Sequence, residues 1–243
     1  MTPSSVEAPV WGAVLLAGGS GRRLAGAAPD KILMSLAGEP VVLWSVRALL
    51  AGGPLACIVV VYRDAEQHDQ IERLLAEGAI DAAAIHWAKG GPERSDSVRA
   101  GLAALPDSVT HVLIHDGARP AVAAGDIANC RRQAEADGAA CLARPVTDTI
   151  KRVSAPGAWQ RQVIEDLDRE RLRAMETPQA FEKVGIVAGY RRAAETGGSP
   201  TDDAAAWALT GGRVSLVQPT APNPKLTRPE DIPLLERLLV PKP

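Results

Sequence analysis

Short apolar runs alternate with longer stretches that carry apolar residues at helical spacing through the first half of the chain. The runs at 11–16, 57–61, 84–87, 111–115 and 139–143 predict strands, and the stretches at 40–50, 64–75 and 95–105 predict helices, the last with Ser95 as its N-cap. The continuous β-branched run at 57–61 is typical of a strand buried on both faces. This alternation predicts an α/β fold with a mostly parallel twisted sheet and right-handed crossovers.

The pattern changes after Gly138. Residues 145–153 alternate polar and apolar side chains, which predicts a half-exposed antiparallel strand, and a turn at 154–157 and a charged stretch at 165–171 follow. We expect a projecting β-arm at about residues 145–176, followed by helices at 183–195 and from 201, and a strand at 214–217. Without a repeat or a linker, the sequence predicts one domain over residues 1–243 that includes this arm.

A glycine loop follows the first strand. Gly18, Gly19, Ser20 and Gly21 precede Arg22 and Arg23, and Lys31 lies eight residues further on. Glycines let backbone N–H groups approach phosphates, and the basic side chains neutralise their charge. A P-loop would need Gly-Lys-Ser/Thr, and a dinucleotide fingerprint would need a third glycine where position 24 is leucine. The sequence therefore indicates a polyphosphate site of another kind, or a turn that only joins strand to helix.

Three loops should meet at one edge of the sheet. Residues 18–23, 90–94 and 116–119 each follow a predicted strand, and ligands of such sheets bind at the carboxyl ends of the strands. Asp116 would then face basic groups and glycine amides, and one carboxylate beside phosphates suits Mg²⁺. In the alternative, Asp116 only caps a turn and pairs with Arg119. The pair Asp202 and Asp203 fits a helix N-terminus better than a second metal site.

Composition and charge narrow the function. The 243 residues include 27 basic and 29 acidic side chains, for a net charge of −2, which disfavours a general nucleic-acid binder or membrane-surface binder. The three cysteines are widely spaced, so we expect reduced, buried thiols. Neither a signal peptide nor an apolar stretch of ~18 residues is present, and we expect a cytoplasmic protein.

Several motifs together resemble one family. They are A-G-G-S-G-R-R-L with P-D-K, G-G-P-E-R-S-D-S-V, H-D-G-A-R-P, P-V-T-D-T-I-K, L-D-R with T-P-Q-A-F, T-D-D-A and N-P-K-L-T-R-P-E-D. In this order and spacing, from about residue 11 to 240, the chain resembles the 2-C-methyl-D-erythritol 4-phosphate cytidylyltransferases of the non-mevalonate isoprenoid pathway. The related ribitol-5-phosphate cytidylyltransferases share most of these motifs.

The resemblance implies a Rossmann-like nucleotidyltransferase fold and a chemistry. The acceptor phosphate attacks the α-phosphorus of CTP in line and pyrophosphate leaves, with a divalent cation such as Mg²⁺ at Asp116. The positions that match catalytic residues of the family are Arg23, Lys31 and Lys225. Those that match nucleotide-binding positions are Ala17, Gly18, Gly19, Ser20, Gly21, Gly91, Ser97, Asp116 and Gly117.

The resemblance also implies how the acceptor is bound. Arg119, Thr177 and Lys225 match positions around the sugar phosphate. Thr149 and Arg169 match residues of the arm that reach the neighbouring subunit's site, which implies a homodimer.

Four positions depart from the family pattern. Asp30 is inserted before Lys31, where it could displace or pair with the ammonium; Pro92 and Pro222 stand where Asp is common; and Gly18 stands where alanine is usual, which should only loosen the loop. Asp116 would then hold the metal alone. The departures at Asp30, Pro92 and Pro222 leave open a non-catalytic CTP-binding homologue.

Overall fold

Seven strands form one sheet in the described part of the chain. The structure, a computed structural model, describes residues 8–19, 30–157 and 159–240. The strand order is β11-β7-β10-β6-β1-β4-β5. The strands are β1 (Trp11–Leu16), β4 (Cys57–Tyr62), β5 (Ile85–Lys89), β6 (His111–Asp116), β7 (Ala139–Pro145), β10 (Arg173–Glu182) and β11 (Ser215–Val217). β10 pairs antiparallel with β6 and β7, whereas the other pairs are parallel. The mostly parallel sheet is therefore confirmed.

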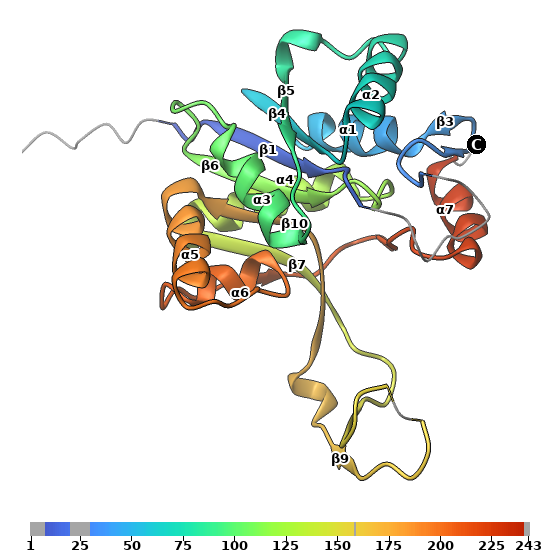
Figure 1. The fold of residues 1–243 in the computed structure, drawn as a ribbon, viewed down its shortest axis with the longest axis vertical. Coiled ribbons are helices and arrows are strands. Elements are labelled where there is room, and N and C mark those ends of the chain that lie inside the picture. The colour runs from blue at the N-terminus through green and yellow to red at the C-terminus, as the bar shows by residue number, and fades with distance from the viewer. Residues whose placement is uncertain (1–7, 20–29, 158, 241–243) are drawn as a thin grey trace, which may run out of the picture.

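Helices cover both faces of the sheet (Figure 1). They are α1 (Val41–Ala51), α2 (Ala65–Glu77), α3 (Arg94–Ala103), α4 (Ala124–Asp137), α5 (Lys183–Glu195), α6 (Asp203–Ala208) and α7 (Ile232–Leu239). One apolar cluster contains residues of α1, α2, α4 and α7, and the other contains residues of α3, α5 and α6. Because successive strand residues face opposite ways, Leu15 of β1 lies in the first cluster and Val14 in the second.

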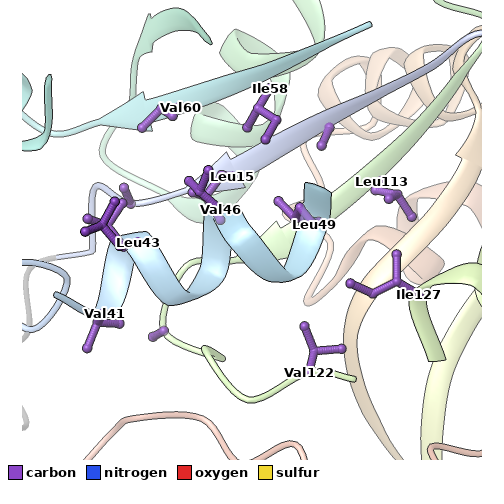
Figure 2. Packing of buried hydrophobic residues seen from close by; sticks show 14 of the residues in the cluster. Leu15, Val41, Leu43, Val46, Leu49, Ile58, Val60, Leu113, Val122 and Ile127 are labelled. Carbon is purple, nitrogen blue, oxygen red and sulfur yellow. The ribbon is translucent and has the colours of Figure 1, made fainter. Parts of the chain in front are cut away.

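Helix α1 fixes the strand that leads into the glycine loop. Val46 and Leu49 lie over Leu15 of β1 and Ile58 of β4 in the same cluster (Figure 2). All four side chains are fully buried, and burying each contributes roughly 1.5–3 kcal/mol. This packing sets where the carboxyl ends of β1 and β4 open.

Local capping explains one difference from the sequence prediction. Helix α3 begins at Arg94, and its N-cap is Glu93 and not Ser95. The Asp96 carboxylate accepts the Glu93 N–H at 3.2 Å, so the acid in the first helical turn satisfies the backbone in place of a serine hydroxyl. At α6 the prediction is confirmed, because Asp202 is the N-cap and accepts the Ala205 N–H at 2.9 Å.

Helix α4 is an element that the sequence patterns above did not predict. Its buried residues Ile127, Cys130 and Ala134 lie at spacings of three and four, which is a helical signal, although a weak one among so many polar neighbours. Gly138 ends the helix with a φ of 81°, a conformation that favours glycine.

The arm projects from β7 and β10, as Figure 1 shows below the body. Its regular part is the short hairpin of β8 (Lys151–Val153) and β9 (Ile164–Asp166), so the strand expected over 145–153 is wrong in its extent. Pairing of β7 with β10 stops at Pro145 and Arg173, and the next residues have no neighbouring strand to bond with. A second hairpin, β2 (Ser35–Leu36) and β3 (Glu39–Pro40), lies before α1, and short 3₁₀ turns lie at Ala82–Ala84, Arg169–Arg171 and Pro229–Asp231.

None of the helices in the described ranges combines the length and apolarity that spanning a membrane requires.

Candidate active site

A cavity of about 790 Å³ opens where β1, β4, β5 and β6 end. The described lining residues are Leu16, Gly18, Gly19, Lys31, Ile32, Arg63, Gly91, Pro92, Glu93, Arg94, Ser97, Asp116, Ala118, Lys225 and Thr227. They include members of all three loops that the sequence predicted to meet, so this convergence is confirmed. Ser20, Gly21 and Arg23 lie outside the described residues.

The charge of the cavity suits a polyanion. Its described lining contains the basic side chains of Lys31, Arg63, Arg94 and Lys225, against the carboxylates of Glu93 and Asp116. A concave surface with an excess of one sign concentrates ligands of the other sign. The lining therefore favours a phosphate chain over a neutral ligand.

Asp116 lies at the centre of these charges. Its Oδ2 accepts from Lys225 Nζ at 2.5 Å, and its Oδ1 lies 3.4 Å from Arg94 Nε. Burial alone would raise the pKa of this carboxyl, but the charges of Lys225 and Arg94 outweigh burial and hold the pKa well below its usual range. The carboxylate stays ionised. Of the alternative, the turn is present, since Arg119 donates its backbone N–H to the Asp116 carbonyl at 2.9 Å. Asp116 does more than close this turn, because its carboxylate pairs with Lys225 and Arg94.

Arg94 is fixed by a buried acid. Its guanidinium makes two bonds to Asp203, of 3.0 and 2.7 Å, and Tyr190 donates its hydroxyl to the same carboxylate at 2.6 Å. Although burial disfavours the charged form, the charge of Asp203 raises the pKa of Arg94 above its ordinary value. Asp203 therefore serves to hold Arg94.

A polar chain behind the cavity orients Asp116. The Asp116 N–H donates to the Thr177 hydroxyl at 3.0 Å, which lies 3.1 Å from His115 Nδ1. His115 Nε2 lies 3.1 Å from the Arg119 carbonyl, so Nε2 carries the proton and Nδ1 accepts from Thr177. Burial lowers the pKa of His115 to about 4, and the imidazole is neutral. Thr177 thus supports the site from behind.

Two of the predicted nucleotide positions shape the entrance to the cavity. A Cβ at Gly18 would come within 3.2 Å of the Tyr62 and Arg63 backbone, so a larger residue here would need a small shift of the ends of β1 and β4. The expectation that this glycine loosens the loop stays a prediction. Across the cavity, Gly91 donates its N–H to the Ser97 hydroxyl at 3.3 Å.

Ala17 and Gly117 lie next to described residues that line the cavity but do not line it themselves. Ala17 donates to the Val61 carbonyl at 2.9 Å, and Gly117 donates to the Leu16 carbonyl at 3.0 Å while its own carbonyl accepts from Ser45 at 2.7 Å. Both residues are absent from the described lining. Their backbone groups hold the strand ends together.

Lys31 lines the cavity although Asp30 precedes it. Its Nζ donates to the Leu226 carbonyl at 3.3 Å. Asp30 forms an ion pair with Arg63, at 2.9 Å. Asp30 therefore neither displaces Lys31 from the cavity nor takes its place there.

The remaining predicted substrate residues lie apart from the described lining. Arg119 donates from Nη1 to the carbonyl of Asn223, two residues before Lys225, at 2.6 Å. Thr149 and Arg169 lie on the arm, where Arg169 donates to the Thr147 carbonyl at 2.8 Å. Within one chain, the structure does not bring these two arm residues to the cavity.

Sequence reasoning missed Arg63 and the role of Arg94. Arg63 comes directly after β4, so the rule that strand ends meet at one edge could have found it. Arg94 fell inside a loop that was predicted to converge, but nothing in the sequence showed that Asp203, over a hundred residues away, would fix it.

Comparisons with known proteins agree with this geometry. The chain matches the profile of the family 2-C-methyl-D-erythritol 4-phosphate cytidylyltransferase (IspD) over residues 12–240. The enzyme of that name from Synechococcus sp. (strain CC9902) is 39% identical over 226 residues, which cover 93% of this chain and 96% of the relative.

Solved structures show the same fold. A structure titled as 2-C-methyl-D-erythritol 4-phosphate cytidylyltransferase from Thermus thermophilus superposes with a TM-score of 0.73 at 27% identity, covering 95% of this chain and 98% of that one. The 4-diphosphocytidyl-2C-methyl-D-erythritol synthase of Anaerococcus prevotii superposes with a TM-score of 0.80 at 24% identity, covering 95% and 96%. The chain therefore belongs to the 2-C-methyl-D-erythritol 4-phosphate cytidylyltransferase family.

Proposed function

We propose that this protein transfers the cytidylyl group of CTP to 2-C-methyl-D-erythritol 4-phosphate, giving 4-diphosphocytidyl-2-C-methyl-D-erythritol and pyrophosphate. The observation that carries the proposal is the cavity of four described basic side chains around one ionised carboxylate, in a chain of this family. The acceptor phosphate attacks the α-phosphorus in line, a P–O bond forms, and the bond to the pyrophosphate oxygen breaks.

The residues supply position and charge. A phosphate monoester is already an anion near neutral pH, so the attack needs no side-chain base. Lys31 and Lys225 stand where they can neutralise charge on the triphosphate, and cations placed in this way are worth about 10²-fold or more in rate. Arg94, held by Asp203, adds a fixed charge beside Asp116. We include Arg23 in this set by its match to the family motif.

A divalent cation fits Asp116. The carboxylate is ionised and lines the cavity among groups that attract phosphates, and Mg²⁺ commonly binds through one or two carboxylates together with substrate phosphates. Bound Mg²⁺ would neutralise phosphate charge during transfer. Among the described lining residues the other carboxylate is Glu93, whose Oε2 accepts from the Ser199 hydroxyl at 2.6 Å. We therefore assign Asp116 to the metal. Its Oδ2 would bind the cation in place of the Lys225 ammonium.

We also propose a homodimer formed through the arm. Trp159 is 95% exposed and Val163 is 75% exposed, and Ile164 and Val153 of the hairpin are exposed as well. Apolar side chains gathered on a projecting hairpin favour burial against a partner. Such pairing would bring Thr149 and Arg169 to the partner's cavity, which their own chain does not do.

The location of the protein stays a prediction. Cys57, Cys130 and Cys141 are free and buried, and burial raises the pKa of Cys130 to about 12. Unpaired thiols support a cytoplasmic location.

The product distinguishes the proposal from other uses of CTP. We would incubate the protein with CTP, methylerythritol phosphate and Mg²⁺ and follow the phosphorus NMR spectrum. We expect the coupled signals of a diphosphate diester together with pyrophosphate. CDP would indicate transfer of the terminal phosphoryl group, and CMP would indicate hydrolysis; either as the main product contradicts the proposal.

A further inference from the structure

A buried carboxylate lies directly before the cavity lysine. The side chain of Asp30 is 5% exposed, and three donors surround it, at Ile32, Gln67 and Arg63. Lys31, the next residue, instead lines the cavity. Neighbouring side chains therefore face opposite ways, one into the protein and one toward the ligand site.

The first oxygen of Asp30 shapes the backbone around Lys31. Oδ1 accepts the N–H of Ile32 at 3.0 Å, which closes a turn with Lys31 at its centre. Ile32 is 1% exposed, and its carbonyl accepts the Val42 N–H at 3.0 Å. The residues on both sides of Lys31 are thus anchored to the body of the protein.

The second oxygen ties this turn to two strand ends. Oδ2 accepts from Gln67 Nε2 at 2.6 Å and from Arg63 Nη1 at 2.9 Å. Gln67 is 1% exposed, donates also to the Ala17 carbonyl at 3.1 Å, and accepts the Arg63 N–H at 2.7 Å. One amide therefore joins the end of β1, the end of β4 and the residue before Lys31.

We propose that Asp30 is a positioning residue that directs the Lys31 ammonium into the cavity, with Gln67 and Arg63 as its supports. The inference rests on the proposed function, because it assigns to Asp30 a part in cytidylyl transfer. Displacing a charged group by about 1 Å can cost on the order of 10²-fold in rate. Asp30 acts through Lys31 and does not itself line the cavity with the described residues.

A double-mutant cycle tests the coupling. The variants Asp30→Ala, Lys31→Met and their combination are compared with the wild type for kcat and for the Kd of CTP. We expect Lys31→Met to lower kcat by about 10²-fold and Asp30→Ala by about 10-fold or more. In the Lys31→Met background, Asp30→Ala should change kcat and Kd by less than about twofold, because the residue that Asp30 positions is absent. A larger change would show that Asp30 acts through Arg63, its ion-pair partner in the lining, and would contradict the inference.

Two further variants separate positioning from folding. Asp30→Asn keeps one acceptor oxygen and should fold even if Asp30→Ala does not; it should lower kcat less, and again only when Lys31 is present. Glu135→Ala removes a carboxylate that accepts from Trp11 Nε1 at 2.8 Å, at the opposite end of β1, and should leave kcat within about twofold of wild type.

Two results would overturn the inference. One is an equal loss of kcat on replacing Asp30 in the wild type and in the Lys31→Met variant. The other is an unchanged kcat and Kd in both Asp30→Ala and Asp30→Asn. If the wild type binds CTP but transfers nothing, the proposed function fails. The inference is then decided by the Kd of CTP alone, by comparing the effect of Asp30→Ala in the presence and in the absence of Lys31.

Discussion

At the scale of single residues, the site depends on charges that hold one another in place. Asp116 lies between Lys225 and Arg94, and Arg94 is itself fixed by Asp203. Each charge is partly desolvated, so removing one leaves its partner uncompensated. Substitutions here therefore affect both the residues that contact the ligand and the residues that hold them in place. Their effects on activity need to be compared with those of matched substitutions outside the cavity.

The loss of Lys225 should lower turnover strongly. We expect Lys225→Met to lower kcat by about 10²-fold or more, because a cation that neutralises charge in the transition state is lost. The control is Lys183→Met; Lys183 donates to the Pro106 carbonyl at 2.8 Å and lies outside the described lining. Steady-state kinetics with saturating CTP measure both variants. Equal activity of Lys225→Met and wild type would show that Lys225 has no part in the reaction.

His115 should make stability depend on pH. Its pKa in the folded protein is about 4, mainly through burial, against about 6.5 in an unfolded chain. Between these values the unfolded chain binds more protons, so the folded state loses stability as pH falls through this window and is unaffected above it. From pH 6.5 to 5 the loss attributable to this histidine is about 1–2 kcal/mol.

Urea unfolding of wild type and His115→Gln at several pH values isolates this effect, because all other groups titrate in both proteins. The variant is expected to start from a lower stability, since two hydrogen bonds are altered, but to show a flatter profile between pH 6.5 and 5. Parallel profiles for the two proteins would mean that His115 is not buried in its neutral form.

At the scale of elements, the strand ends do the positioning. β1, β4, β5 and β6 each deliver one part of the cavity, and their apolar sequences made this arrangement predictable. The arm differs from the buried strands of the sheet. Its short hairpin is held by exposed ion pairs such as Arg152 with Glu165 at 2.7 Å. Exposed pairs of this kind contribute little, and the hairpin has few buried contacts of its own.

The arm should therefore control assembly. We expect replacement of both Val163 and Ile164 by Asp to shift the protein from dimer to monomer in sedimentation velocity, and to lower turnover because Thr149 and Arg169 no longer reach a partner. Val184→Asp is the control, since Val184 on α5 is 80% exposed outside the arm. A wild type that is monomeric at micromolar concentration, or a double variant that remains dimeric, would contradict this role.

At the scale of the whole molecule, local patterns predicted most of the framework. The runs at 57–61 and 111–115 became β4 and β6, and the helix over 183–195 has the expected ends, because hydrophobic periodicity records which face is buried. Helix α4 was not predicted, and the arm strand was predicted too long because its end depends on where a partner strand stops. The convergence of three loops followed from topology alone.

The side-chain contacts within the site could not be predicted from local sequence patterns. Nothing local in the sequence links Asp30 to Gln67, or Arg94 to Asp203, since these contacts join segments far apart in the chain. The sequence suggested that Asp30 could displace the Lys31 ammonium or pair with it. In the structure the Asp30 side chain is instead buried in the protein. Such partners are selected by tertiary packing, which a single sequence does not record.

Pyrophosphate release from CTP, measured with Mg²⁺ and with three acceptor conditions, decides whether the whole molecule is the enzyme proposed here. We predict release with 2-C-methyl-D-erythritol 4-phosphate, far less with ribitol 5-phosphate, and none without an acceptor. Faster release with ribitol 5-phosphate would assign a different acceptor to the site. Binding of CTP without release under any of the three conditions would contradict the catalytic function.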